Sequence, residues 1–245
     1  MNKTVKGYVI KQTEVKESDA FVTIIDEDSQ LISFYAHGIR KPKSKNSFAC
    51  SLFAHSEFVL QSKDGNRWQI QSSNCLSSHH HLYEEYEKLI YANIMCDMVY
   101  DICNIEVVPL YATFTQALKE LQVRKDSNLV LLLFLVSLLR FLGIQIVVDG
   151  CCICGSQTVN SISIQDGGFL CENCRNEYAS FYEEDVLRKF RYINKADFSH
   201  IDELEQTGKF PDILIEILYQ FMRKYTGISS RSIAFLADIS KMKLD

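Results

Sequence analysis

The first third of the chain alternates between apolar and polar positions in short runs, a pattern typical of β-strands. Five runs rich in β-branched and aromatic residues are separated by polar or glycine-containing segments, at 5–11, 20–25, 31–37, 55–61 and 67–74. Asp64-Gly65 predicts a tight hairpin turn before the last run. Five short strands in so few residues predict a small β-barrel, and the five-stranded OB-fold is the first candidate.

After Cys75 the apolar residues recur every three or four positions, which predicts helices. The stretch from Leu82 to Cys103 carries apolar residues on two faces, so we expect this helix to lie between other helices. Pro109 ends that pattern, and a second helix is predicted to begin at Leu110.

A third helix is predicted over the apolar run 129–142, in which Arg140 is the only charged residue. Asp126 or Ser127 can cap its start, and Gly143 can end it. The run is shorter than the roughly 18–20 apolar residues that a membrane span needs, and no signal-peptide pattern begins the chain. We therefore expect a buried core helix in a cytoplasmic protein.

Further helices are predicted over 178–193 and 211–226, with Pro211 in a first turn and Gly227 at an end. A short helix over 229–236 completes the pattern. The lone Trp68 lies in a predicted strand, where a half-buried role in the core is expected.

The cysteines point to a metal site. Five of the nine lie between residues 151 and 174, and an odd, clustered set is typical of metal ligands in a reducing compartment. Two C-x2-C pairs are separated by sixteen residues with a hairpin pattern, which predicts a zinc ribbon with four thiolate ligands. The expected ligands are Cys151, Cys154, Cys171 and Cys174.

The choice between Cys151 and the adjacent Cys152 stays open, although Cys151 has the better spacing to Cys154. Four protein ligands leave no open position on the metal, so we expect a structural site. Core cysteines without a metal are the alternative. A redox pair is disfavoured because no βαβ pattern surrounds either motif.

The net charge of −5 is unevenly distributed, since residues 1–78 carry a balance of +2 and the rest −7. Four cations, Arg40, Lys41, Lys43 and Lys45, form a basic segment (residues 40–45) between two predicted strands. Such cations can bind phosphates, and the nearby aromatic residues Phe34, Tyr35 and Phe48 offer stacking surfaces for bases. A solvated connecting loop is the equal alternative.

The remaining sequence patterns give weaker evidence of function. His79, His80 and His81 are expected to form a solvated helix start, because three consecutive side chains point in different directions. The chain has no phosphate-binding glycine loop, no nucleophile elbow and no H-E-x-x-H motif. We therefore expect no enzymatic activity.

Several stretches, taken in their order along the chain, match the pattern of a known family. They are Gly7-Tyr8-Val9-Ile10, Glu17-Ser18-Asp19, Ala36-His37-Gly38-Ile39-Arg40-Lys41 with Ser44, the central run 134–143, the cysteines with Gly155 and Gly167-Gly168, and more weakly Ser230-Arg231-Ser232. Through these stretches the sequence resembles the RecO family of bacterial DNA repair and recombination mediators.

The resemblance implies an α+β multidomain protein. Its parts would be an OB-fold DNA-binding domain over 1–78, a helical domain over 79–245 and a four-cysteine zinc ribbon inserted at 149–176. It also implies binding of single- and double-stranded DNA, annealing of complementary strands, and action with RecR to load RecA onto DNA covered by the single-strand-binding protein SSB. The expected location is the cytoplasm, at the nucleoid.

The family also binds the acidic, aromatic-ended tail of SSB on its helical domain. Such a tail requires an apolar pocket with a cation at its rim. Arg140 is the candidate cation, although capping of its own helix or pairing with a carboxylate is the simpler role. Leu133 stands where some members carry a basic residue before the equivalent of Phe134, which leaves the place of this site open.

Two other classes remain as alternatives. A zinc-stabilised protein-interaction module would need no DNA contact, and salt-dependent binding of an oligonucleotide separates it from a DNA-binding adaptor. A metal-dependent enzyme would need an exchangeable ligand on the metal, which four cysteines do not leave.

Overall fold

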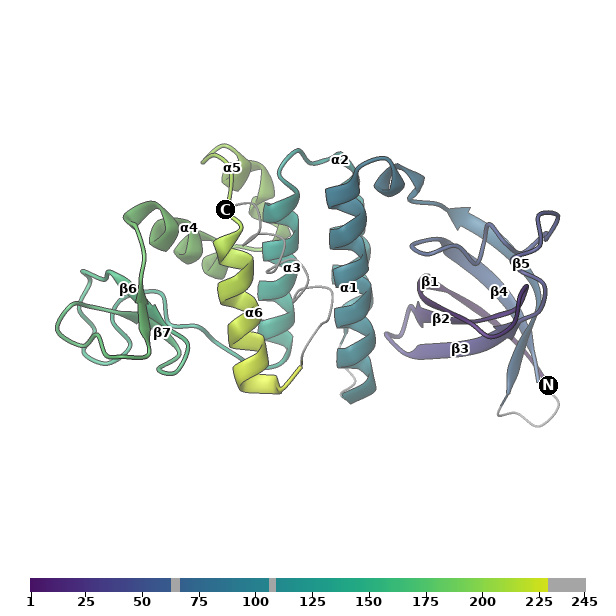
Figure 1. The fold of residues 1–245 in the computed structure, drawn as a ribbon, viewed down its shortest axis with the longest axis horizontal. Coiled ribbons are helices and arrows are strands. Elements are labelled where there is room, and N and C mark those ends of the chain that lie inside the picture. The colour runs from purple at the N-terminus through teal and green to yellow at the C-terminus, as the bar shows by residue number, and fades with distance from the viewer. Residues whose placement is uncertain (63–66, 106–108, 229–245) are drawn as a thin grey trace. The chain divides into compact units, whose positions relative to one another are not determined.

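The computed structural model describes residues 1–62, 67–105 and 109–228, which fall into two compact units (Figure 1). The first unit is Met1–Gln122, and the second begins at Val123. The first unit combines a five-stranded sheet with helices, and the second consists of helices and a small sheet. The protein is therefore mixed α+β, and the expected domain boundary after residue 78 stays a prediction.

The five strands of the first unit lie where the sequence predicts them. They are β1 (Asn2–Glu14), β2 (Ala20–Asp26), β3 (Leu31–Ala36), β4 (His55–Gln61) and β5 (Trp68–Ser77). Antiparallel ladders join β1 to β2, β2 to β3, β4 to β5 and β4 to β1. A short parallel ladder joins β3 to β5, so the pairing returns to its starting strand.

Strand β1 makes this return possible because it is long and bulged. Its first half, Asn2 to Tyr8, pairs with β4, while Gly7 to Glu14 pairs with β2. The register of the second ladder shifts between Val9 and Lys11. An extra residue of this kind bends a strand and increases its twist, which lets one strand serve two neighbours.

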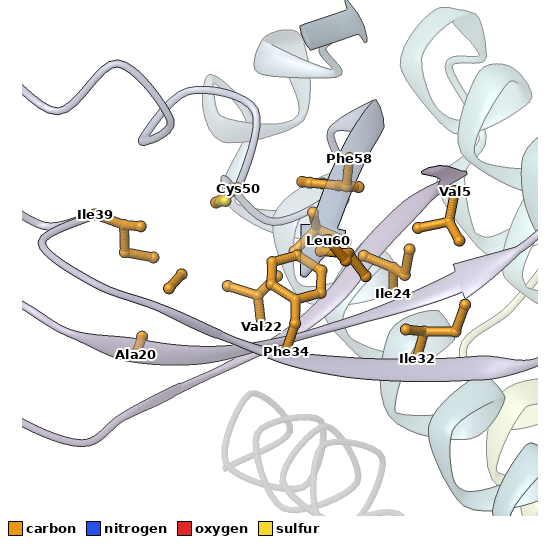
Figure 2. Close-up of a cluster of buried hydrophobic side chains, with 12 residues drawn as sticks. Val5, Ala20, Val22, Ile24, Ile32, Phe34, Ile39, Cys50, Phe58 and Leu60 are labelled. Atoms are coloured by element: carbon orange, nitrogen blue, oxygen red, sulfur yellow. The ribbon is translucent and has the colours of Figure 1, made fainter. Parts of the chain in front are cut away.

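The alternating apolar residues fill the interior of the sheet (Figure 2). Phe34 and Phe58 meet there with ring centroids 5.0 Å apart. Ile39 and Cys50 enter the same cluster from the segment between β3 and β4. Trp68 packs against the cluster and is half-buried, as its strand position predicts.

The helical elements of the first unit are η1 (His80–Tyr83), α1 (Tyr86–Ile105) and α2 (Leu110–Val123), the last of which ends one residue beyond the unit. Aromatic contacts connect α2 to the sheet. The buried Tyr8 stacks on His55 at 4.6 Å and meets Phe114 edge-on at 5.7 Å. The hydroxyl of Tyr111 lies 3.0 Å from His55 Nε2.

The expectation that all three consecutive histidines are solvated is wrong for His79. His80 and His81 are exposed, but His79 is buried against Tyr8 and hydrogen-bonds to Gln122. The reason is its position before η1, where the side chain turns toward the sheet instead of water.

The second unit is built around α3 (Ser127–Phe141), which is buried along nearly its whole length. Its other elements are β6 (Ser161–Ser163), β7 (Gly168–Leu170), β8 (Ala179–Phe181), α4 (Glu184–Lys195), η2 (Phe198–His200), α5 (Ile201–Glu205) and α6 (Ile213–Thr226). Helices α4, α5 and α6 pack against α3, which explains its apolar sequence. Within the described residues, no helix combines the length and apolar character that crossing a membrane requires.

The caps of α3 follow the prediction. Asp126 accepts a hydrogen bond from Leu129 N at 3.2 Å and, with its other oxygen, one from Phe210 N at 2.8 Å. Gly143 follows the helix with a φ of 72°, a conformation that glycine adopts without strain.

Of the predicted elements, one helix needs correction, and a turn and a second helix lie outside the described residues. The helix predicted from residue 178 begins only at Glu184, because Ala179–Phe181 pairs with β6 as a third strand. The turn at Asp64-Gly65 and the helix over 229–236 lie outside the described residues.

Two histidines of the first unit, the buried His79 and the half-buried His55, determine a prediction of how stability depends on pH. Burial lowers the pKa of both His55 and His79 below the ordinary value of 6.5. The unfolded chain therefore binds more protons than the folded one as the pH falls below about 6.5, so the folded state should lose stability. We expect the melting temperature to decrease from pH 7.5 to pH 5.5, and to decrease less in His79→Phe, which removes one titrating group.

His80→Gln is the matched control, since His80 is exposed in the same sequence run. A His79→Phe variant with the same pH dependence as the wild type and His80→Gln would contradict the assignment.

Candidate functional site

The four cysteines predicted as ligands come together in the second unit. The sulfur atoms of Cys151, Cys154, Cys171 and Cys174 all lie within 4.8 Å of one another. Cys154 Sγ and Cys171 Sγ are 3.6 Å apart. Four sulfur atoms placed tetrahedrally about 2.3 Å from a zinc ion would be about 3.8 Å apart. The cluster therefore has the size and the donor set of a tetrahedral metal site.

Tight turns bring each cysteine pair together. In the first, Gly155 N donates to Cys151 O at 2.8 Å, and Gly155 has a φ of 76° that favours glycine. In the second, Cys174 N donates to Cys171 O at 3.1 Å. The hairpin predicted between the two turns is present as β6 and β7, labelled in Figure 1. The third strand, β8, was missed because its three residues are too few to establish a strand period beside the periodic helix that follows.

Cys152 lies outside the cluster. Its backbone N–H donates to Phe169 O at 2.8 Å, which ties this residue to β7. Its side chain is half-buried, and burial raises the pKa of its thiol. The structure therefore groups Cys151, and not its neighbour, with the other three cysteines.

The electrostatics of the cluster favour a bound cation. Burial opposes ionisation of Cys151, but N–H groups of Cys154, Cys171 and Ile153 outweigh it and lower the Cys151 pKa to about 6. The pKa of Cys174 is raised to about 12, first because Cys154 and Cys171 hydrogen-bond to its thiol. Several thiolates this close repel one another, so full ionisation of the set requires a metal ion.

A second group of potential ligands, His80, His81 and Glu84, is exposed. His81 Nδ1 lies 3.2 Å from a Glu84 oxygen, which is an ordinary surface pair one helical turn apart. This group is therefore no evidence for a metal site.

The basic segment lies within the connection between β3 and β4, and buried residues flank it on both sides. Ile39 before it and Cys50 after it are buried in the core of the sheet. Three of its cations, Lys41, Lys43 and Lys45, are exposed. Among the residues that the structure describes, none of the three takes part in an ion pair.

Arg40 differs from the three lysines. Its guanidinium lies 2.7 Å from a carboxylate oxygen of Glu14, at the end of β1. This pair offsets the charge of Arg40, so Arg40 is less available to phosphate than the lysines.

The aromatic residues near the basic segment divide into two groups. Phe34 is fully buried in the core and cannot stack on a base. Phe48 is exposed, and Tyr35 meets the exposed Phe21 edge-on with centroids 5.4 Å apart. Sequence reasoning missed Phe21, although the register would have revealed it, because Phe21 pairs directly with Tyr35 across β2 and β3.

Arg140 is exposed in the last turn of α3, and its guanidinium donates to Asn194 O at 2.8 Å. Lys224 and Arg231, from the two C-terminal helices that the sequence predicts, were further candidates for the rim cation beside Arg140. Lys224 on α6 is also exposed, and Arg231 lies outside the described residues. Among the described residues, Arg140 therefore connects α3 to α4 through its hydrogen bond to Asn194 O.

The second unit also has an open groove of about 600 Å³ that the sequence did not indicate. Val123, Arg124, Lys125, Asp126, Glu205 and Lys209 line it. Arg124 contacts the carboxylates of Asp202 and Glu205, so the charges in this groove are largely balanced.

Together, the five-stranded sheet, the helical second unit and the four-cysteine cluster define a class of α+β proteins built from two units with a potential metal site of four cysteines. The family model for the Recombination protein O N terminal matches residues 1–79, and the model for the Recombination protein O C terminal matches residues 83–233. The chain belongs to the RecO family.

Curated relatives match over nearly their whole length. They include proteins named DNA repair protein RecO from Acetivibrio thermocellus, 28% identical with 97% of each chain covered, and from Exiguobacterium sibiricum, 26% identical with 93% of each covered. A third, with the same name, is from Bacillus pumilus and is 24% identical, with 97% of this chain and 94% of the relative covered.

Proposed function

We propose that this chain is a non-enzymatic DNA-binding recombination mediator. It would anneal complementary strands and, with RecR, help to load RecA onto single-stranded DNA covered by SSB. The family match and the relatives named DNA repair protein support a role in DNA repair and recombination. The observation that carries the DNA-binding step is the exposed lysine segment on the five-stranded sheet.

The sheet supports this function in two ways. Five strands with a closing ladder are the features of an OB-fold, which binds oligonucleotides, and we assign the sheet to that fold. Lys41, Lys43 and Lys45 would contact phosphates, while Tyr35 and Phe21 would offer ring surfaces to bases. Both single- and double-stranded DNA carry the phosphates that such cations bind.

The same lysines would also promote the annealing of complementary strands. Two complementary strands repel each other through their phosphates, and a protein that neutralises some of these phosphates lowers the barrier to their encounter. The net charge of −5 does not prevent this, because the cations are gathered locally.

We further propose that the four-cysteine cluster holds one structural zinc ion. The donor set and spacing support this assignment. Cys151, Cys154, Cys171 and Cys174 would hold the ion, which would link the two turns at the base of the β6–β7 hairpin. Four protein ligands leave no position for a substrate, which supports a role in folding and not in catalysis.

A protein-interaction module without a DNA role is the second candidate. Three exposed apolar side chains favour it, namely Ile153 between the first two cysteines, Tyr178, and Phe181 on β8. Under the leading proposal the second unit would instead meet RecR or the SSB tail, at the nucleoid in the cytoplasm. Co-purification with RecR and SSB from the source organism tests those partners.

The basic segment should determine how DNA binding depends on salt. Replacing Lys41, Lys43 and Lys45 with alanine should weaken binding to an unstructured oligonucleotide and reduce the slope of log affinity against log salt by up to about 2, because each lost phosphate contact contributes about 0.7. Arg40→Ala alone should have a smaller effect, since Arg40 already pairs with Glu14. Fluorescence anisotropy at several salt concentrations measures both.

The matched control replaces three exposed lysines from other parts of the chain, Lys119, Lys125 and Lys224. An unchanged slope in the Lys41/Lys43/Lys45 variant, or an equal reduction in the control, would show that the basic segment is only a solvated connection.

The zinc assignment predicts one metal ion per chain. Cys171→Ser should lose the ion and lower the melting temperature, because metal binding contributes to folding free energy. Cys152→Ser is the control and should retain the metal, since Cys152 lies outside the cluster. Elemental analysis measures the content, and a wild-type protein purified without chelator that contains no zinc would overturn the assignment.

Arg140 gives a test of the SSB-tail site. If Arg140 binds the terminal carboxylate of the tail, Arg140→Ala should weaken binding of a labelled SSB-tail peptide about tenfold, the loss expected for one charge-assisted hydrogen bond. Arg188→Ala is the control, because Arg188 is an exposed arginine on α4 that pairs with Asp185. Equal affinities of the three folded proteins would exclude Arg140 from the site.

A further inference from the structure

A buried carboxylate lies beside the basic segment. Asp19, the residue just before β2, is 3% exposed. It accepts hydrogen bonds from the Tyr35 hydroxyl and from Gly38 N at 2.7 Å, and its Oδ1 lies 3.0 Å from His37 Nδ1. Burying a carboxylate is unfavourable unless its oxygens are paired. These donors, first the Tyr35 hydroxyl and then Gly38 N, hold the pKa of Asp19 well below its usual value.

The three donors come from one stretch of chain, the end of β3 and the residues that lead into the basic segment. Backbone contacts strengthen the same connection, because Arg40 N donates to Ser18 O at 3.1 Å. Gly38 has a φ of 63°, a left-handed conformation that points its N–H at the carboxylate. Asp19 therefore fixes the direction in which the chain leaves β3.

Asp19 also fixes an aromatic ring. The hydroxyl that it binds belongs to Tyr35, whose ring contacts the exposed ring of Phe21. Rotation of the Tyr35 ring away from this contact would break the hydrogen bond and leave the buried carboxylate with fewer partners. One carboxylate thus holds both the ring surface and the start of the basic segment.

We infer that Asp19 is a positioning residue for nucleic acid, which holds Tyr35 and the lysines of the basic segment in one arrangement so that a single strand meets both at once. Asp19 is buried and acts through these residues, without a DNA contact of its own. The inference rests on the proposed DNA-binding function of the basic segment.

The direction in which DNA affinity changes when the charge of Asp19 is removed separates a positioning role from simple electrostatic repulsion. A carboxylate near DNA repels phosphate, so removing its charge alone would strengthen binding. Loss of positioning has the opposite effect, because lysines and rings that are no longer held together must be ordered when DNA binds. A weaker complex after neutralisation is thus expected only for the positioning role.

The test uses Asp19→Asn in the full-length protein and a fluorescent oligothymidine as the probe. We expect Asp19→Asn to bind about tenfold more weakly, a loss that corresponds to about 1.4 kcal/mol. Glu17→Gln is the matched control, since Glu17 is an exposed carboxylate in the same turn, and it should bind with equal or greater affinity. The fluorescence of Trp68, which packs on the sheet core, reports folding.

Equal or tighter binding by folded Asp19→Asn overturns the inference. If Asp19→Asn does not fold, Tyr35→Phe decides, because it keeps the ring and removes the hydroxyl that Asp19 holds. Binding several-fold weaker than that of the wild type supports the inference, and unchanged binding overturns it.

A double-mutant cycle tests whether Asp19 acts through the lysines. Asp19→Asn should have a much smaller effect when Lys41, Lys43 and Lys45 are already alanine, and an undiminished effect contradicts the inference. Failure of the wild type to bind the oligonucleotide would instead contradict the proposed function. The two failures are therefore distinguishable.

Discussion

The first unit depends on the ability of strand β1 to pair on both sides. Its N-terminal half completes a ladder with β4, and its C-terminal half completes one with β2. The shift of register between Val9 and Lys11 gives the strand the bend that both ladders require. Without it, the sheet would have an unpaired edge and an open core. The anchoring of the basic segment at Ile39 and Cys50 depends on that same closed interior.

The sequence predicted most of the elements because their signals are local. Alternation placed the five strands, and a three-to-four residue period placed the helices up to Phe141. The two cysteine turns were predictable because a C-x2-C spacing determines its own geometry. β8 was not, since three residues are too few to establish a period beside a strongly periodic helix.

Long-range pairings were beyond sequence reasoning for a different reason. Arg40 looks like a free cation in the sequence, but Glu14 meets it from a strand that ends 26 positions earlier. His79 looks solvated beside two exposed histidines, but Tyr8 covers it. In each case the partner is distant in sequence, so only the folded chain reveals whether the charge or ring is available.

Because buried residues flank the basic segment, its binding of a polyanion can change during evolution without a change in the folding of the sheet. Because Ile39 and Cys50 are buried while the lysines between them face water, changes of charge or length within the segment disturb little of the core. Doubling the length of such a loop costs only about 0.6 kcal/mol in closure entropy. Lineages can therefore lengthen, shorten or recharge this segment and adjust their affinity for a polyanion while the sheet beneath it stays the same.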